Sequence, residues 1–169
     1  MGAYGGGASA DLGRSFDVGE WRAGEPVVVG PWEVVADRVL HPGDAYGLRL
    51  RERATGAVLA HTGDTDACAA VVGLARDADL LLAEAAFHEG RDADRGVHLT
   101  GRRAAEVARD AGARRLLLTH LPPWNDPQRT LVEASGVGYA GGRGPRPPRA
   151  GRRGLSARRS RARGAGARA

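Results

Sequence analysis

The residues of this sequence best suited to chemistry are its histidines and a few carboxylates. The five histidines are His41, His61, His88, His98 and His120. His41 follows the apolar segment 32–40, His120 follows segment 115–119, and Asp64 lies in a Gly-Asp-Thr turn just after segment 57–61. Functional groups in α/β sheets collect beyond the carboxyl ends of strands, and two imidazoles and a carboxylate there would suit zinc or manganese. Taken singly, each feature is weak, because a lone histidine near a strand end is more often structural.

The elements that must position these side chains alternate between strand and helix patterns. Strands are predicted at 26–30, 32–40, 46–53, 57–61, 79–84 and 115–119, and helices at 66–76, at 100–111 and in a short last segment after Asp126-Pro127. Thr100 is the expected N-cap and Gly112 the expected stop of the second helix. Antiparallel strands followed by βαβαβα order predict a layered α/β domain whose second half has parallel strands.

Five segments in this order resemble a known family. They are VLHPGDAYGLRL, HTGDT, LLLAEAAF, VHLTGRRAAEVA and LLLTHLPPW. They look like the C-terminal half of metallo-β-lactamase-fold hydrolases, in the branch of ribonuclease Z and related cyclic-nucleotide phosphodiesterases. The resemblance covers about residues 25–135. It implies an α/β fold that is one half of an αββα sandwich over residues 25–139, with residues 1–24 as a remnant of the other half.

The resemblance also implies roles for five residues. His41 matches the histidine ligand of a first metal, His120 matches that of a second, and Asp64 matches the carboxylate that bridges both. His98 matches a histidine beside the scissile phosphate that helps to protonate the leaving oxygen, and Glu84 matches the acid that orients it. Two divalent metals are thus expected, with zinc favoured and manganese as the alternative.

The sequence departs from this family in one important respect. The family's signature H-x-H-x-D-H, which supplies four metal ligands, is absent, and no histidine precedes His41. Each metal would keep two protein ligands from this chain, below the three that catalytic zinc usually has. We therefore expect a fragment that is inactive alone and that exposes the sheet face meant for the missing half. The candidate runs for that face are Val27–Val29, Val34–Val35, Val58–Leu59, Leu80–Leu82 and Leu116–Leu118, and self-association through it, for example as a homodimer, is expected.

Charge is distributed unevenly along the chain. The whole chain has 25 basic and 20 acidic residues, but residues 140–169 contain ten arginines and no acid. This segment has too few apolar side chains to fold, which predicts a disordered basic tail. This segment is either an arm that binds nucleic acid or a tail without function. We prefer the second interpretation, because the segment lacks aromatic residues for base stacking. The lone Cys68 excludes a disulfide framework, and the absence of a signal peptide or membrane span predicts a cytoplasmic protein.

Two classes of function remain open from the sequence. The first is a metal-dependent hydrolase acting on a small phosphodiester or a nucleic acid, with the small substrate slightly favoured because no inserted arm for gripping tRNA is found. The second is a non-catalytic remnant or a basic-tailed nucleic-acid-binding protein. The aromatic residues Tyr46 and Trp124 are interpreted as packing residues, not as ligand contacts. His61 and His88 match no functional position of the family.

Overall fold

The computed structural model describes residues 19–139 and Gly141. The predicted remnant at 1–24 lies largely outside these residues, and so does the predicted disordered tail at 140–169 apart from Gly141. None of the described helices is long and apolar enough to cross a membrane.

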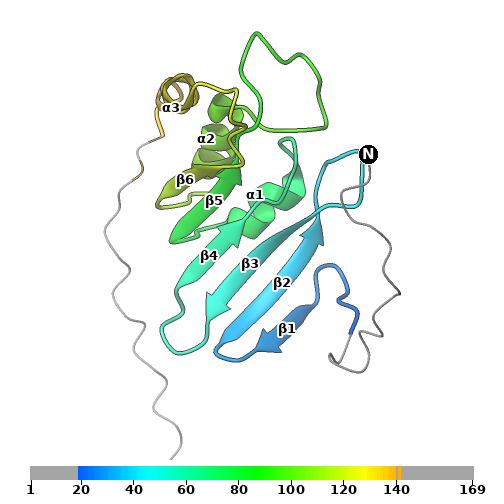
Figure 1. Cartoon of the computed structure of the whole chain (residues 1–169). Coiled ribbons are helices and arrows are strands. Elements are labelled where there is room, and N and C mark those ends of the chain that lie inside the picture. Colours follow the sequence, from blue (N-terminus) through cyan, green and yellow to red (C-terminus); the bar gives the residue numbers. More distant parts are fainter. Residues whose placement is uncertain (1–18, 140, 142–169) are drawn as a thin grey trace, which may run out of the picture.

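Six strands form one sheet in the order in which they occur along the chain (Figure 1). The strands are β1 (Pro26–Val29), β2 (Trp32–Arg38), β3 (Tyr46–Glu52), β4 (Val58–His61), β5 (Leu80–Glu84) and β6 (Leu116–Thr119). The pairs from β1 to β4 are antiparallel, whereas β4–β5 and β5–β6 are parallel. The predicted α/β class, with parallel strands in its second half, is confirmed.

Three helices follow β4, β5 and β6, namely α1 (Ala69–Ala75), α2 (Gly101–Asp110) and α3 (Pro127–Ser135). The side chain of Thr100 accepts a hydrogen bond from the N–H of Arg103, and that of Asp126 accepts one from the N–H of Gln128, so both predicted N-caps are present. Gly112 ends α2 in the left-handed conformation, with φ of 66°.

The first helix is shorter than the predicted 66–76 segment. It begins after Cys68 because Asp66 is used elsewhere. The buried Asp66 carboxylate pairs with the guanidinium of Arg103 in α2 and accepts the N–H of Gly96 at 2.8 Å. Asp66 therefore connects its own loop to the loop of Gly96 and to helix α2, and it does not cap α1.

The hydrophobic core lies on one face of the sheet, beneath α1 and α2. Helix α1 packs on β2, β3 and β4, α2 packs on β5 and β6, and α3 packs against α2. The core side chains include Val58, Ala60, Leu81 and Ala83 from the strands, with Val71, Leu74, Ala104, Val107 and Ala108 from the helices. The carboxyl ends of the strands are thereby held in a fixed arrangement on which the loops of the site are built.

The other face of the sheet is also apolar, and no described helix packs on it. One row of side chains in register across five strands is Val27, Val34, Leu50, Leu59 and Leu80; the next is Ala36, Leu48, His61, Leu82 and Leu117. Leu117 at the β6 edge is 55% exposed and Val29 is 49% exposed, whereas Val34 and Ala36 in the same rows are buried. This arrangement, one sheet with helices on one face only, is the predicted half of an αββα sandwich.

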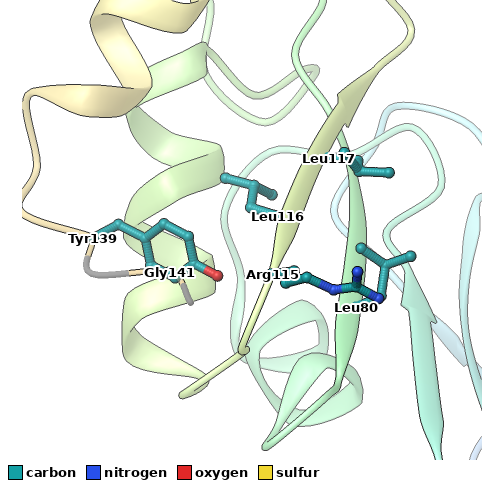
Figure 2. Close-up of a pocket in the computed structure, with 6 residues that line it drawn as sticks. All are labelled: Leu80, Arg115, Leu116, Leu117, Tyr139 and Gly141. Carbon is teal, nitrogen blue, oxygen red and sulfur yellow. The ribbon is translucent and has the colours of Figure 1, made fainter. Parts of the chain in front are cut away.

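The predicted membership of the exposed face was only half right. Val58 and Leu81 were expected on it, but they are buried in the core under the helices. Side chains of a strand alternate between faces, so each apolar run supplies residues to both. Figure 2 shows this alternation in β6, where Leu116 lies on the side of Tyr139 and Leu117 lies on the opposite side.

Candidate functional site

Loops at one edge of the sheet bring together all five residues singled out from the sequence. Strands β2, β4, β5 and β6 run in the same direction, so their carboxyl ends share this edge. Glu84 is the last residue of β5, and His120 directly follows β6. His41 and Asp64 lie in the loops after β2 and β4, and His98 lies just before α2.

His98 is at the centre of this group. The centroid of its ring lies 5.4 Å from that of His41 and 5.2 Å from that of His120. The ring of Phe87 packs against the same ring in a T-shaped arrangement, with centroids 5.0 Å apart. The His41 ring is held in turn by its Nδ1, which accepts the N–H of Gly43 at 3.3 Å. Three imidazoles thus gather at one point of the sheet edge.

Glu84 fixes the orientation of His98. Its side chain is 2% exposed, and its Oε1 accepts a hydrogen bond from Nδ1 of His98 at 2.7 Å. The same oxygen accepts the N–H of Thr65 at 2.8 Å, and Oε2 accepts the N–H of Ala86 at 3.0 Å. A carboxylate held by two backbone donors cannot swing away, so Nδ1 of His98 carries the proton and Nε2 is the nitrogen left for chemistry.

Asp64 and His120 form the exposed part of the site. Nδ1 of His120 lies 2.9 Å from Oδ1 of Asp64, and the side chains are 43% and 51% exposed. Gly63 positions Asp64 with a φ of 64°, and a Cβ there would lie 2.4 Å from the carbonyl oxygen of Tyr46, so this turn requires glycine. His120 itself has φ of 52°, a conformation that costs a non-glycine residue about 1–3 kcal/mol and that Asp77, outside the site, also adopts.

The donor atoms of Asp64 and His120 have a spacing that suits one divalent metal. Two ligands of one zinc ion lie about 3.0–3.5 Å apart, because each is about 2.0–2.2 Å from the metal, and the 2.9 Å between Asp64 and His120 is close to that spacing. Ligand atoms of Glu84, His98 and His120 also lie within 4.8 Å of one another. Oε1 of Glu84 already accepts two hydrogen bonds, however, so we assign Glu84 to His98 and not to a metal.

The other two histidines do not join the site. His88 is 2% exposed, and its Nδ1 lies 3.4 Å from Oε1 of Glu133 in α3. His61 lies on the apolar sheet face, and its Nδ1 accepts the N–H of Gly63 at 3.2 Å. All histidines of the chain are thereby accounted for, and His41, His98 and His120 are the ones that converge.

Thr65 is the residue that sequence reasoning missed. It is fully buried, and besides its N–H bond to Glu84 its Oγ1 accepts the N–H of Leu40 at 3.1 Å. It therefore connects the loops of His41, Asp64 and Glu84. The signal was present in the Gly-Asp-Thr motif, where only the aspartate had been given a role.

A hollow of about 480 Å³ adjoins His98 and His120. Its other walls are Phe87, the loop residues Arg91 and Asp92, and the segment Leu121–Trp124. The guanidinium of Arg91 bonds both carboxylate oxygens of Asp92 and lowers the pKa of that carboxyl below its ordinary value. Trp124 is 77% exposed, so the prediction that it is a packing residue is wrong.

A second hollow, of about 490 Å³, lies at the opposite ends of β5 and β6 (Figure 2). Its walls are Leu80, Arg115, Leu116, Leu117, Tyr139 and Gly141. No histidine or carboxylate lines it, and it is separated from the site by the length of both strands. We therefore place the chemistry in the first hollow.

Comparison with known proteins agrees with this fold. Residues 10–121 match the model of the beta-lactamase superfamily domain. The chain belongs to the metallo-β-lactamase superfamily. It is 41% identical over 129 residues to an uncharacterized protein of Mycobacterium leprae, covering 76% of this chain and 45% of the relative. It is 39% identical over 135 residues to a ribonuclease Z of Myxococcus xanthus, covering 73% and 41%.

Among solved structures of the superfamily, the metallo-β-lactamase-fold protein YhfI of Bacillus subtilis matches with a TM-score of 0.64 and 27% identity. The match covers 69% of this chain and 48% of YhfI. The chain thus spans about half the length of the relatives it matches. The family is hydrolytic and includes ribonuclease Z and metallo-hydrolases.

Proposed function

We propose that residues 25–139 form the part of a metal-dependent phosphodiesterase that protonates the leaving group and supplies a share of its metal ligands. The observation that carries this proposal is the position of His98 between His41 and His120, with its Nδ1 held by the buried Glu84. A structural histidine would not need a carboxylate that is itself fixed by two backbone N–H groups. The arrangement is what a positioned proton donor requires.

In this mechanism, His98 acts as an imidazolium with a proton on each ring nitrogen, and it gives the proton of Nε2 to the oxygen that leaves the phosphate. The carboxylate of Glu84 keeps the Nδ1–H in place during that transfer, so the ring presents Nε2 in one orientation only. Phe87 packs against the ring and restricts its rotation further. His120 and Asp64 lie on the solvent side, where a phosphate group can enter.

His41, Asp64 and His120 would hold the metals, with zinc favoured over manganese for imidazole ligands. When bound, two such metals supply Lewis-acid stabilisation of the phosphate oxygens and an activated water. The chain offers two ligands to each metal, because Asp64 is shared. The remaining ligands would come from protein residues outside these 169, and we expect the 169-residue chain by itself to be inactive.

The substrate class follows from the relatives and from the hollow. The Myxococcus xanthus relative is named ribonuclease Z, which suggests a phosphodiester of nucleic-acid type. The hollow of about 480 Å³ beside His98 is of the size that takes a single small ligand. We propose a small phosphodiester such as a nucleotide as the substrate.

The test compares the chain alone with a complemented chain. Hydrolysis of a chromogenic phosphodiester, bis(p-nitrophenyl) phosphate, is measured with zinc or manganese. The 169-residue chain is assayed first by itself and then after fusion to the part of the Mycobacterium leprae relative that it does not match. We expect turnover only in the fusion, and a loss of about 10²–10⁴-fold on His98→Ala. Turnover by the chain alone, or a fusion unaffected by His98→Ala, would contradict the proposal.

A second candidate function is nucleic-acid binding through the ten arginines of residues 140–169. Arginine contacts to phosphates give affinity without sequence preference and with strong salt dependence. This function does not exclude the first. The two functions can be tested by separate variants, because residues 140–169 and the histidine site have no residue in common.

A further inference from the structure

Trp124 presents its indole to solvent at the mouth of the site. It is 77% exposed, the most exposed of the large hydrophobic residues that the structure describes. It lies in the short connection between His120 and α3. An indole left in water forgoes the stabilisation of about 1.5–3 kcal/mol that burying a large apolar side chain provides. Its exposed position therefore needs an explanation.

The exposure of Trp124 does not result from a loose loop. The next residue, Asn125, is buried, and its Nδ2 donates to the carbonyl oxygen of Ala86 at 2.8 Å. Its Oδ1 accepts a hydrogen bond from the Arg91 guanidinium at 2.8 Å, and its N–H donates to the carbonyl of Pro122 at 2.9 Å. Pro122 and Pro123 fix two backbone φ angles just before the tryptophan. The turn is thus anchored on both sides and holds the indole outward.

The hollow under Trp124 has two chemically different ends. His98 and His120 form the reacting end. The other end has the indole, two prolines and the Arg91 guanidinium, whose charge is balanced by a two-oxygen contact with Asp92. Because this end combines flat apolar surfaces with a neutralised ion pair, it suits a planar uncharged group better than a second phosphate.

We propose that Trp124 is a stacking platform for a nucleobase whose phosphate lies at His98 and His120. This rests on the proposed phosphodiesterase function and extends it to the part of the substrate that is not cleaved. Every base has a π-face, so stacking on an indole gives affinity without choosing between bases. The platform would favour nucleotide phosphodiesters over alkyl phosphodiesters.

The experiment measures binding of two ligands to the full 169-residue chain by calorimetry in the presence of manganese. Adenosine 5′-monophosphate carries a base, and ribose 5-phosphate is the same molecule without it. The basic tail can contact the phosphate of both, so the difference in affinity between them isolates the base. We expect AMP to bind about 10-fold more tightly, in line with a stacking contribution of about 1–3 kcal/mol.

Trp124→Ala should remove this preference and leave the affinity for ribose 5-phosphate unchanged, and Trp124→Phe should retain part of it. The matched control is Trp21→Ala, because Trp21 is 47% exposed and does not line the hollow. Equal affinity for both ligands in the unmodified chain, or an undiminished preference in Trp124→Ala, would overturn the platform while leaving the phosphodiesterase proposal standing. Binding of neither ligand would overturn the platform, whereas the phosphodiesterase function is decided separately by the hydrolysis assay of the fusion.

Discussion

Removal of the Glu84 carboxylate should destabilise the whole domain as well as release His98. Glu84 is 2% exposed and accepts hydrogen bonds from the backbone N–H groups of Thr65 and Ala86. Leaving a buried donor unpaired costs about 1–3 kcal/mol, so Glu84→Ala should lower the free energy of unfolding by about 2–6 kcal/mol. Glu84→Gln keeps one acceptor oxygen but turns an NH₂ group toward one donor. It should lower the free energy of unfolding by about 1–3 kcal/mol.

Urea denaturation followed by circular dichroism measures both effects as shifts of the midpoint at a constant slope. The matched control is Glu25→Ala, because the side chain of Glu25 is 64% exposed and makes only a 3.9 Å contact with Arg22. This control should change the free energy of unfolding by less than about 0.5 kcal/mol. If Glu84→Ala is as mild as Glu25→Ala, Glu84 does not hold the strand-end loops together, and its hold on His98 is not as described.

Four further predictions follow from particular contacts. Burial raises the pKa of Asp66. The N–H groups of Gly96 and Ala67 and the Arg103 guanidinium lower it by more than burial raises it, so the pKa of Asp66 is below its ordinary value. The contribution of the Asp66 carboxylate to stability should therefore be complete above about pH 4 and be lost as the pH falls below that value. A urea unfolding midpoint that stays constant from about pH 5 to pH 3 would contradict this pH dependence. In thermal unfolding, Gly63→Ala should destabilise the domain by more than Gly30→Ala. Both glycines have positive φ, but only at Gly63 would a new Cβ lie 2.4 Å from a backbone oxygen. Equal effects would refute the close approach between Gly63 and the backbone of Tyr46. Leu117→Glu should reduce self-association in sedimentation experiments. Val132→Glu should not, because Val132 is 70% exposed on α3 and lies outside the apolar face. A monomeric unmodified chain would refute association through this face. Deletion of residues 142–169, which contain ten arginines, should abolish salt-sensitive binding of single-stranded RNA at an unchanged melting temperature, whereas a lower melting temperature would show that the segment supports the fold.

The secondary structure could be predicted because local signals agreed with the fold. Thr100, Asp126 and Gly112 mark helix ends by their own backbone and side-chain preferences, and each is found in that role. The start of α1 could not be predicted in this way. Asp66 is a good N-cap by type, but its pairing with Arg103, 37 positions away, overrides the local preference.

The candidate site was predictable for a different reason. His41, Asp64 and His120 follow strands that share one edge, so strand direction alone brings them near one another. The roles of Thr65, Asn125 and Trp124 depend on contacts between distant loops, which no local pattern encodes. The same limit applied to the apolar face, where a run such as Leu80–Leu82 divides between core and surface according to a register fixed only by the assembled sheet.

We propose that His41, Asp64 and His120 hold two metals, with Asp64 shared, beside a histidine oriented by Glu84. The most direct measurement is a zinc titration of the 169-residue chain, followed by NMR of the ring nitrogens of its five histidines. The rings of His41 and His120 should both shift on addition of zinc, and those of His61 and His88 should stay unchanged. Asp64→Asn should weaken the effect on both ligands, because each metal shares this carboxylate. Zinc-induced shifts at His61 or His88, or unchanged rings of His41 and His120 in excess zinc, would contradict this assignment.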